Sequence, residues 1–197
     1  MAVIVIGGNS RSVGKTSVVA GLIAALPHFH WTAMKITQYG HGICSQNGES
    51  CHCATDDHSW MISEESDRSG ESDTSRFLVA GAQRAWWVRT EQGRLAEAMP
   101  TVRQKLAESQ NAILESNSIL KFVRPDLYLT VLDPATADFK KTAQEFLDLA
   151  DAAIVHASPK TTWANISLKP VAARPLFTIQ PPLYVTQEIV DFVASRL

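Results

Sequence analysis

The sequence has no excess of charge of either sign, few cysteines and no long hydrophobic run. It has 18 Lys and Arg residues against 20 Asp and Glu, with a formal net charge of −2, so its composition gives no electrostatic argument for nucleic acid or an anionic membrane as a partner. No apolar run approaches the roughly 18 residues that a membrane-spanning helix needs. We also find no internal repeat and no low-complexity tract. We therefore expect an ordinary soluble protein with no nucleic-acid partner and no membrane association.

The first residues and the cysteines bear on the cellular compartment. No basic region precedes the first apolar run, residues 2–6, and that run leads directly into a glycine-rich turn, so it is typical of a strand rather than of a signal peptide. Three cysteines without a secretory signal argue against a disulfide framework. We therefore expect a cytoplasmic protein.

Short apolar runs alternate with helix-like stretches along the 197 residues, a length that suffices for one domain with a sizeable core. Runs typical of strands lie at 2–6, 31–36, 84–89, 112–115, 126–132, 152–155 and 175–179. Stretches typical of helices lie at 15–26, 73–82, 91–109, 138–149 and 186–197. This order predicts a single α/β domain over 1–197, a three-layer sandwich whose mostly parallel, twisted sheet has about seven strands and helices on both faces. Ligands of such sheets bind beyond the carboxyl ends of the strands.

Residues 7–17, GGNSRSVGKTS, join the first strand to the first helix. A buried strand, a glycine-rich turn and a helix that opens on Gly-Lys-Thr form the arrangement of a phosphate-binding loop, or P-loop. Glycines let backbone N–H groups approach an anion closely, and the helix N-terminus adds unpaired donors and the positive end of its dipole. Lys15 would place a charge on the β- and γ-phosphates, and the Thr16 hydroxyl would ligate Mg²⁺. We therefore predict a site for a nucleoside triphosphate, ATP or GTP, with Mg²⁺.

The spacing of this loop differs from the common GxxxxGK[ST] pattern. That pattern needs glycine at position 9, where Asn9 stands, and a gap of five residues separates Gly8 from Gly14. Arg11 has two interpretations, a side chain that folds over the phosphates and one that acts on a neighbouring subunit. The predicted nucleotide-binding residues of the loop are Gly8, Asn9, Ser10, Arg11, Ser12, Val13, Gly14, Lys15, Thr16 and Ser17.

The segment 37–72 has no sustained apolar period, and we expect it to be a Cys/His-rich insertion over the nucleotide site. Its three cysteines fall within ten residues, as C-x6-C-x-C, with histidines interleaved. Thiolate and imidazole together favour zinc, and the candidate ligands are Cys44, Cys51, Cys53 and His58. An iron–sulfur centre, a redox-sensing cluster and a loop with free thiols are the alternatives that this spacing leaves open. A short helix at 60–65 also fits the segment.

The five-residue gap in GNSRSVGKT resembles the phosphate loop of dethiobiotin synthetases and cobyrinic acid amide synthetases, in the signal-recognition-particle/MinD-like class of P-loop NTPases. KITQYG at 35–40 is similar to the KPVQTG stretch of dethiobiotin synthetases, where the lysine meets the phosphate and the substrate carboxylate. By this resemblance Lys35 is a second cation that faces the phosphates. The resembling families also place a Glu near Mg²⁺ at the end of the fourth strand, where this chain has Glu115. Ser116 stands where those families typically have Gly.

Residues 73–82, DTSRFLVAGA, resemble the D-S-x-R-x-x-x-A-G-A segment of the molybdopterin-guanine dinucleotide biosynthesis adaptors, the MobB family. That family also has an early P-loop and a lysine at the end of its second strand. It binds GTP and assists the enzyme that makes the molybdenum dinucleotide cofactor. Asp73 has two interpretations, a catalytic base and the N-cap of the helix that follows. Arg76, one turn later, would reach a phosphate or pair with an acid.

Recognition of the base has a weaker signal. Guanine-binding families often carry N-K-x-D after a late strand, and the corresponding residues here, 155–160, read VHASPK. Because this place lacks that motif, the sequence does not choose between ATP and GTP. The candidates for lining a base pocket are His156 and Pro159.

Two functions fit these residues. The first is a MobB-like adaptor, which binds nucleotide with slow or no turnover and serves a partner protein in cofactor biosynthesis. The second is an ATP-dependent synthetase or phosphotransferase, similar to dethiobiotin synthetase, in which Lys15, Lys35, Glu115 and Asp73 act on a small carboxylate-type substrate. Since related proteins often dimerise across the nucleotide site, the resemblance also implies a homodimer.

Overall fold

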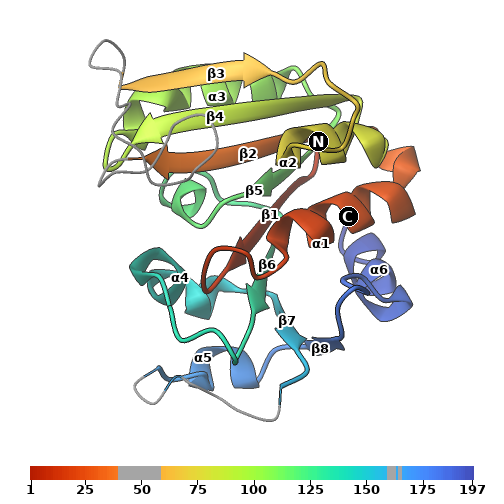
Figure 1. Cartoon of the computed structure of the whole chain (residues 1–197), viewed down its shortest axis with the longest axis vertical. Helices are drawn as coiled ribbons and strands as arrows, with labels where there is room; N and C mark the ends of the chain where they lie inside the picture. Colours follow the sequence, from red (N-terminus) through yellow and green to blue (C-terminus); the bar gives the residue numbers. More distant parts are fainter. Residues whose placement is uncertain (40–58, 159–162, 164–165) are drawn as a thin grey trace.

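The computed structural model describes residues 1–39, 59–158, 163 and 166–197, and its centre is one sheet. The strands are β1 (Val3–Gly8), β2 (Trp31–Tyr39), β3 (Trp60–Glu64), β4 (Arg84–Glu91), β5 (Asn111–Glu115), β6 (Leu127–Leu132), β7 (Ala152–His156) and β8 (Leu176–Ile179). They are arranged in the order β3-β4-β2-β5-β1-β6-β7-β8. All neighbouring strands are parallel except β3 and β4, which are antiparallel (Figure 1). The prediction of an α/β fold with a mostly parallel sheet is confirmed.

Helices cover both faces of this sheet (Figure 1). They are α1 (Lys15–Ala25), α2 (Asp73–Val79), α3 (Leu95–Ala107), α4 (Lys141–Glu145), α5 (Lys169–Ala172) and α6 (Gln187–Ala194), with 3-10 turns η1 (Pro27–Phe29), η2 (Ser118–Lys121) and η3 (Leu147–Leu149). One core packs α1, α2 and α6 against the face that carries Ile4 and Ile6. The other packs α3, η3 and α5 against the face that carries Val5. None of the helices in the described ranges has the length and apolar character that crossing a bilayer requires.

The central strand β1 fixes the place of the predicted phosphate loop. It lies between β5 and β6, so that Ile6 is opposite Glu115 on one side and Gly8 is opposite Val131 on the other. Because these three strands are parallel, their carboxyl ends meet at the same edge of the sheet. The loop after β1 therefore lies between the end of β5 and the segment that follows β6.

The additional strand is β3, where the sequence had suggested a short helix at 60–65. Its side chains alternate: Trp60 and Ile62 pack against the core on the α3 face, while Met61 is exposed. The strand pairs antiparallel with β4, with Ile62 opposite Val88. Five residues are too few to distinguish this alternation from a helical pattern, and pairing with β4 decides the conformation.

The predicted helix at 91–109 is α3 (Leu95–Ala107), and the helix at 138–149 and the N-cap of α2 also differ from the prediction. The helix predicted at 138–149 is reduced to α4 and η3, because Lys140 has an extended backbone whose N–H bonds outside the helix. The N-cap of α2 is Ser72, whose side chain accepts a hydrogen bond from the backbone N–H of Ser75. Asp73 lies in the first turn of α2 instead of capping it, and its carboxylate is available for other contacts.

Candidate functional site

The loop between β1 and α1 has the backbone of an anion site. Gly14, at the N-cap of α1, has a φ of 89°, a left-handed conformation that favours glycine. Lys15 folds back along the loop and its Nζ donates a hydrogen bond of 2.5 Å to the carbonyl oxygen of Ser10. Burial lowers the pKa of Lys15, and Glu115 opposes this effect. A largely buried ammonium thus lies beside the backbone N–H groups at the start of a helix, an arrangement suited to phosphate.

Thr16, Glu115 and Lys35 converge at the carboxyl end of β5, beside the middle of β2. The Thr16 hydroxyl donates a hydrogen bond of 2.7 Å to Glu115 Oε2, and both side chains are buried. Lys35 lies opposite Glu115 in the parallel pairing of β2 and β5, and its Nζ donates to Glu115 Oε1 at 3.2 Å. These residues come from three separate elements, and the sequence predicted their meeting.

Lys35 has a second carboxylate partner, Asp73 in the first turn of α2. Burial alone would lower the pKa of Lys35, but Glu115 and Asp73 together outweigh burial and raise its pKa above the ordinary value. Lys35 is therefore held as a cation. Asp73 is held by this ammonium, and its second oxygen lies 3.9 Å from Nη1 of Arg76.

The oxygen atoms of Thr16 and Glu115 are suited to bind Mg²⁺. This ion prefers oxygen ligands, and in nucleotide sites it takes one or two from the protein and others from phosphate and water. The Thr16 and Glu115 oxygens, 2.7 Å apart beside the loop, supply such a pair. No group of three or more His, Cys, Asp or Glu side chains that could hold a metal occurs among the described residues.

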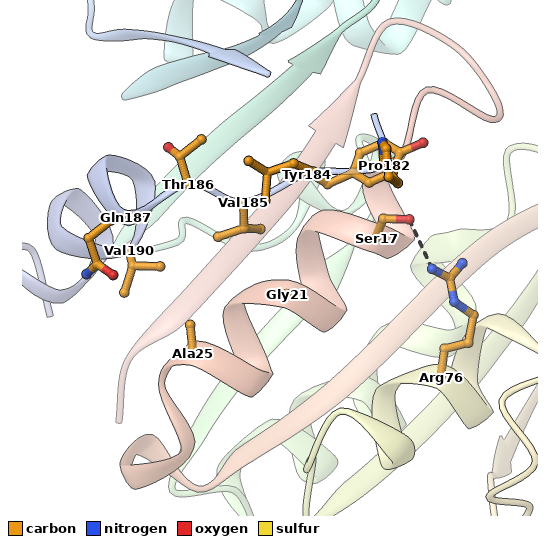
Figure 2. Close-up of a pocket in the computed structure, with 11 residues that line it drawn as sticks. Ser17, Gly21, Ala25, Arg76, Pro182, Tyr184, Val185, Thr186, Gln187 and Val190 are labelled. Atoms are coloured by element: carbon orange, nitrogen blue, oxygen red, sulfur yellow. Dashed lines mark hydrogen bonds between the residues drawn. The ribbon is translucent and has the colours of Figure 1, made fainter. Parts of the chain in front are cut away.

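Beyond Ser17, a groove of about 610 Å³ runs along the outer face of α1 (Figure 2). Arg76 points into it from α2 and donates a hydrogen bond of 3.0 Å to the Ser17 hydroxyl. The opposite wall runs from Pro182, after β8, to Gln187, the first residue of α6. The ring of Tyr184 lies against Gly14 so closely that an added Cβ there would be 2.2 Å from Tyr184 Cε1.

His156, a predicted base-pocket residue, lies next to this aromatic ring. Its Nε2 donates a hydrogen bond of 2.9 Å to the carbonyl oxygen of Val13. Its ring meets that of Tyr184 edge-on, with the ring centres 6.0 Å apart. The end of β7 and the segment after β8 thus both contact the phosphate loop.

Comparison of the sequence with known families and proteins finds no match, whereas comparison of the structure identifies the fold. No protein-family model matches the sequence, and no characterised protein is significantly similar to it. Among solved structures, LpxK from Aquifex aeolicus in complex with ATP resembles 90% of this chain at 17% identity and a TM-score of 0.51. The chain has the fold of a P-loop NTPase.

The chain covers 53% of the length of LpxK, about half of it. HypB from Helicobacter pylori in complex with nickel matches 98% of this chain and 83% of its own, with 12% identity and a TM-score of 0.46. A Zn(II)-bound triple mutant of the YjiA GTPase matches 96% of this chain and 60% of its own, with 10% identity and a TM-score of 0.43.

Several predicted site residues lie outside the described part of the chain. They are the candidate zinc ligands Cys44, Cys51, Cys53 and His58 and the candidate base-pocket residue Pro159. The zinc site and the extent of the insertion at 37–72 therefore stay predictions.

Asn9, which replaces the glycine of the common P-loop pattern, holds the loop through hydrogen bonds of its side chain. The Asn9 side chain is buried, its Oδ1 accepts from the backbone N–H of Asp133 at 2.9 Å, and its Nδ2 donates to the carbonyl oxygen of Asp138 at 3.0 Å. The next residue, Ser10, donates from Oγ to the Asp138 carboxylate at 2.5 Å. The loop is thus bound to the segment that follows β6.

Besides Tyr184, sequence reasoning missed Asn117 and Lys140. Asn117, after β5, accepts from the N–H of Gly8 and donates to its carbonyl oxygen, both at 2.9 Å. Lys140, before α4, donates from its backbone N–H to the carbonyl oxygen of Asn9 at 2.8 Å. Burial, then the nearby charges of Lys15 and Arg11, lower the pKa of Lys140 to about 8. The only signal for Asn117 was its place after a strand end, and nothing local marked Lys140.

Proposed function

We propose that this protein binds a nucleoside triphosphate with Mg²⁺ at the loop after β1, as a P-loop NTPase. The observation that carries the proposal is the convergence of Lys15, Thr16, Lys35 and Glu115 near the carboxyl ends of β1 and β5. The backbone N–H groups at the start of α1 and the Lys15 ammonium would bind the phosphates. Thr16 and Glu115 would hold Mg²⁺, which neutralises the charge that develops on the transferred phosphoryl group. Lys35 would face the terminal phosphate as a second cation.

The groove beyond Ser17 is suited to the nucleoside. In P-loop proteins the phosphates lie along the loop, so the sugar and base would extend past the first turn of α1, where Arg76 and Tyr184 form the walls. An aromatic ring offers a stacking surface to any base, which agrees with a sequence that selects neither ATP nor GTP. Because the LpxK structure holds ATP, ATP is the first nucleotide to test.

The role that we favour for the bound nucleotide is that of a MobB-like adaptor in cofactor biosynthesis, which rests on the resemblance of residues 73–82. In the structure, Asp73 is engaged by Lys35 and lies 3.9 Å from Arg76. These contacts support a structural part for Asp73 rather than one as a catalytic base. A dethiobiotin synthetase-like phosphotransferase is the second candidate, since Lys35 stands where that family meets both phosphate and substrate carboxylate.

Titration calorimetry with ATP and GTP, each with and without Mg²⁺, tests nucleotide binding. The variant Lys15→Ala should weaken binding at least about 100-fold, because a charge-assisted contact to phosphate is lost. The surface variant Lys121→Ala is the matched control, since Lys121 pairs only with Glu145 at the surface among the described residues. Unchanged affinity of Lys15→Ala would contradict the proposal.

Phosphate release separates the two roles. An adaptor should release phosphate slowly whatever small carboxylate is added, and should depend on a protein partner for faster turnover. A synthetase should respond to a small substrate alone. Acceleration by a small carboxylate, absent in Lys35→Ala, would favour the synthetase.

A further inference from the structure

The segment between β6 and α4 is bound to the first half of the phosphate loop. Four hydrogen bonds join Asn9 and Ser10 to residues 133–140. The last of them, from the N–H of Lys140 to the carbonyl oxygen of Asn9, is 2.8 Å long. This bond is between backbone groups, so it fixes the backbone of Lys140 beside the loop in any side-chain conformation.

The side chain of Lys140 differs from the other lysines of the site. Lys15 donates to a backbone carbonyl oxygen, and Lys35 pairs with two carboxylates. Within the described residues, the Lys140 ammonium has no hydrogen-bond acceptor and no ion-pair partner, although it is largely covered. Four charged groups act on it: Lys15 and Arg11 repel it, while Asp138 and Glu115 attract it.

A cation that is covered and repelled by other cations is stabilised by an anion placed among them. The groups that act on Lys140 also indicate which part of a nucleotide would lie there. Lys15 and Glu115 mark the end of the site where the β- and γ-phosphates and Mg²⁺ would bind. Ser17, Arg76 and Tyr184 mark the other end, along the groove. Lys140 lies at the end of the site where the β- and γ-phosphates would bind.

We propose that Lys140 is a further phosphate-binding residue, which contacts the terminal phosphate of a bound triphosphate and so distinguishes triphosphate from diphosphate. This inference rests on the proposed function, because it requires a nucleotide at the loop. Its physical basis is that the terminal phosphate adds the largest charge at the end of the site where Lys140 has no partner of its own. Loss of that phosphate would return Lys140 to the repulsion of Lys15 and Arg11.

Three variants test the assignment. Lys140→Met removes the charge and keeps the side-chain length, Lys140→Arg keeps the charge, and Lys141→Met removes the charge of an exposed neighbouring lysine. Affinities for a non-hydrolysable ATP analogue and for ADP are measured by calorimetry at pH 7.5 with Mg²⁺, or with the GTP analogue and GDP if the protein prefers guanine. Lys140→Met should weaken triphosphate binding about 10- to 100-fold and diphosphate binding less than about threefold. Lys140→Arg and Lys141→Met should bind both nucleotides with nearly the affinity of the parent protein.

The outcomes separate this inference from the proposed function. Equal losses for triphosphate and diphosphate, or no loss for either, would overturn the role of Lys140 while nucleotide binding stands. Failure of the parent protein to bind any nucleotide would overturn both.

Proton uptake gives a second readout that a purely structural lysine would not change. If phosphate binds Lys140, its pKa rises on binding, so the protein takes up protons from the buffer near pH 8.5. Calorimetry in two buffers of different ionisation enthalpy measures the number of protons taken up per nucleotide bound. It should fall in Lys140→Met and stay unchanged in Lys141→Met, whereas equal uptake in all three proteins would overturn the assignment.

Discussion

Lys140→Met should make the nucleotide-free protein more stable. The pKa of Lys140 in the folded chain is about 8 against the ordinary value of 10.5, so the folded state binds this proton more weakly than the unfolded state. A difference of this size corresponds to about 3 kcal/mol at pH 7, since each pKa unit is worth about 1.4 kcal/mol. Methionine retains the unbranched apolar stem without the charge. We therefore expect the free energy of unfolding to increase by about 3 kcal/mol at pH 7.

The pH dependence gives the prediction its sign. Because the pKa is lowered in the folded state, the cost of the charge is complete below pH 8 and decreases as the pH rises towards 10.5. The advantage of Lys140→Met should therefore shrink from about 3 kcal/mol at pH 7 to about 2 kcal/mol at pH 9. Urea denaturation of the parent, Lys140→Met and the control Lys141→Met at both pH values measures it. Equal stability of the parent and Lys140→Met at pH 7 would refute the reasoning that a strained cation lies at the loop.

Three further predictions concern the loop. Asn117→Ala leaves the buried N–H and carbonyl groups of Gly8 without their partner, so urea denaturation should show a loss of about 2–4 kcal/mol, against little change for the exposed control Gln104→Ala. Gly14→Ala should lower the melting temperature and abolish nucleotide binding, because it combines a left-handed φ of 89° with a contact of 2.2 Å to Tyr184; adding Tyr184→Ala relieves only the contact and should restore part of the stability. Glu115→Gln should remove most of the Mg²⁺ dependence of nucleotide affinity, and calorimetry that shows the same dependence as in the parent would exclude Glu115 as a magnesium ligand.

The part of the site that the sequence predicts is the part built from local patterns and strand ends. Lys15 and Thr16 follow from the strand, turn and helix within residues 2–26. Glu115 follows from its place at the end of a strand, and Lys35 follows from the resemblance of residues 35–40 to dethiobiotin synthetases; the register of β2 and β5 places the two residues opposite each other. Sequence patterns carry this information because the backbone geometry of each element is determined over a few residues.

The remaining residues depend on contacts that no local pattern marks. Tyr184 reaches Gly14 because β8 and α6 bring their connecting segment over α1, and the sequence around it shows only two prolines and a loop. Lys140 looked like part of a helix at 138–149, and its N–H bonds to Asn9 instead of continuing that helix. Asn9 itself looked like a departure from the glycine pattern, whereas its side-chain amide joins the loop to the segment that follows β6.

The long-range hydrogen bonds of the phosphate loop also have a consequence for the order of folding. Asn9 bonds to Asp133 across 124 positions of sequence, and Val13 bonds to His156 across 143. Contacts of such long range close large loops of chain, so they form late in folding and contribute little to its transition state. On the ribosome, the loop made first would gain its final set of contacts only after residue 184 has been synthesised, because Tyr184 packs against Gly14. Substitutions of Asn9 should accordingly accelerate unfolding and leave the folding rate nearly unchanged.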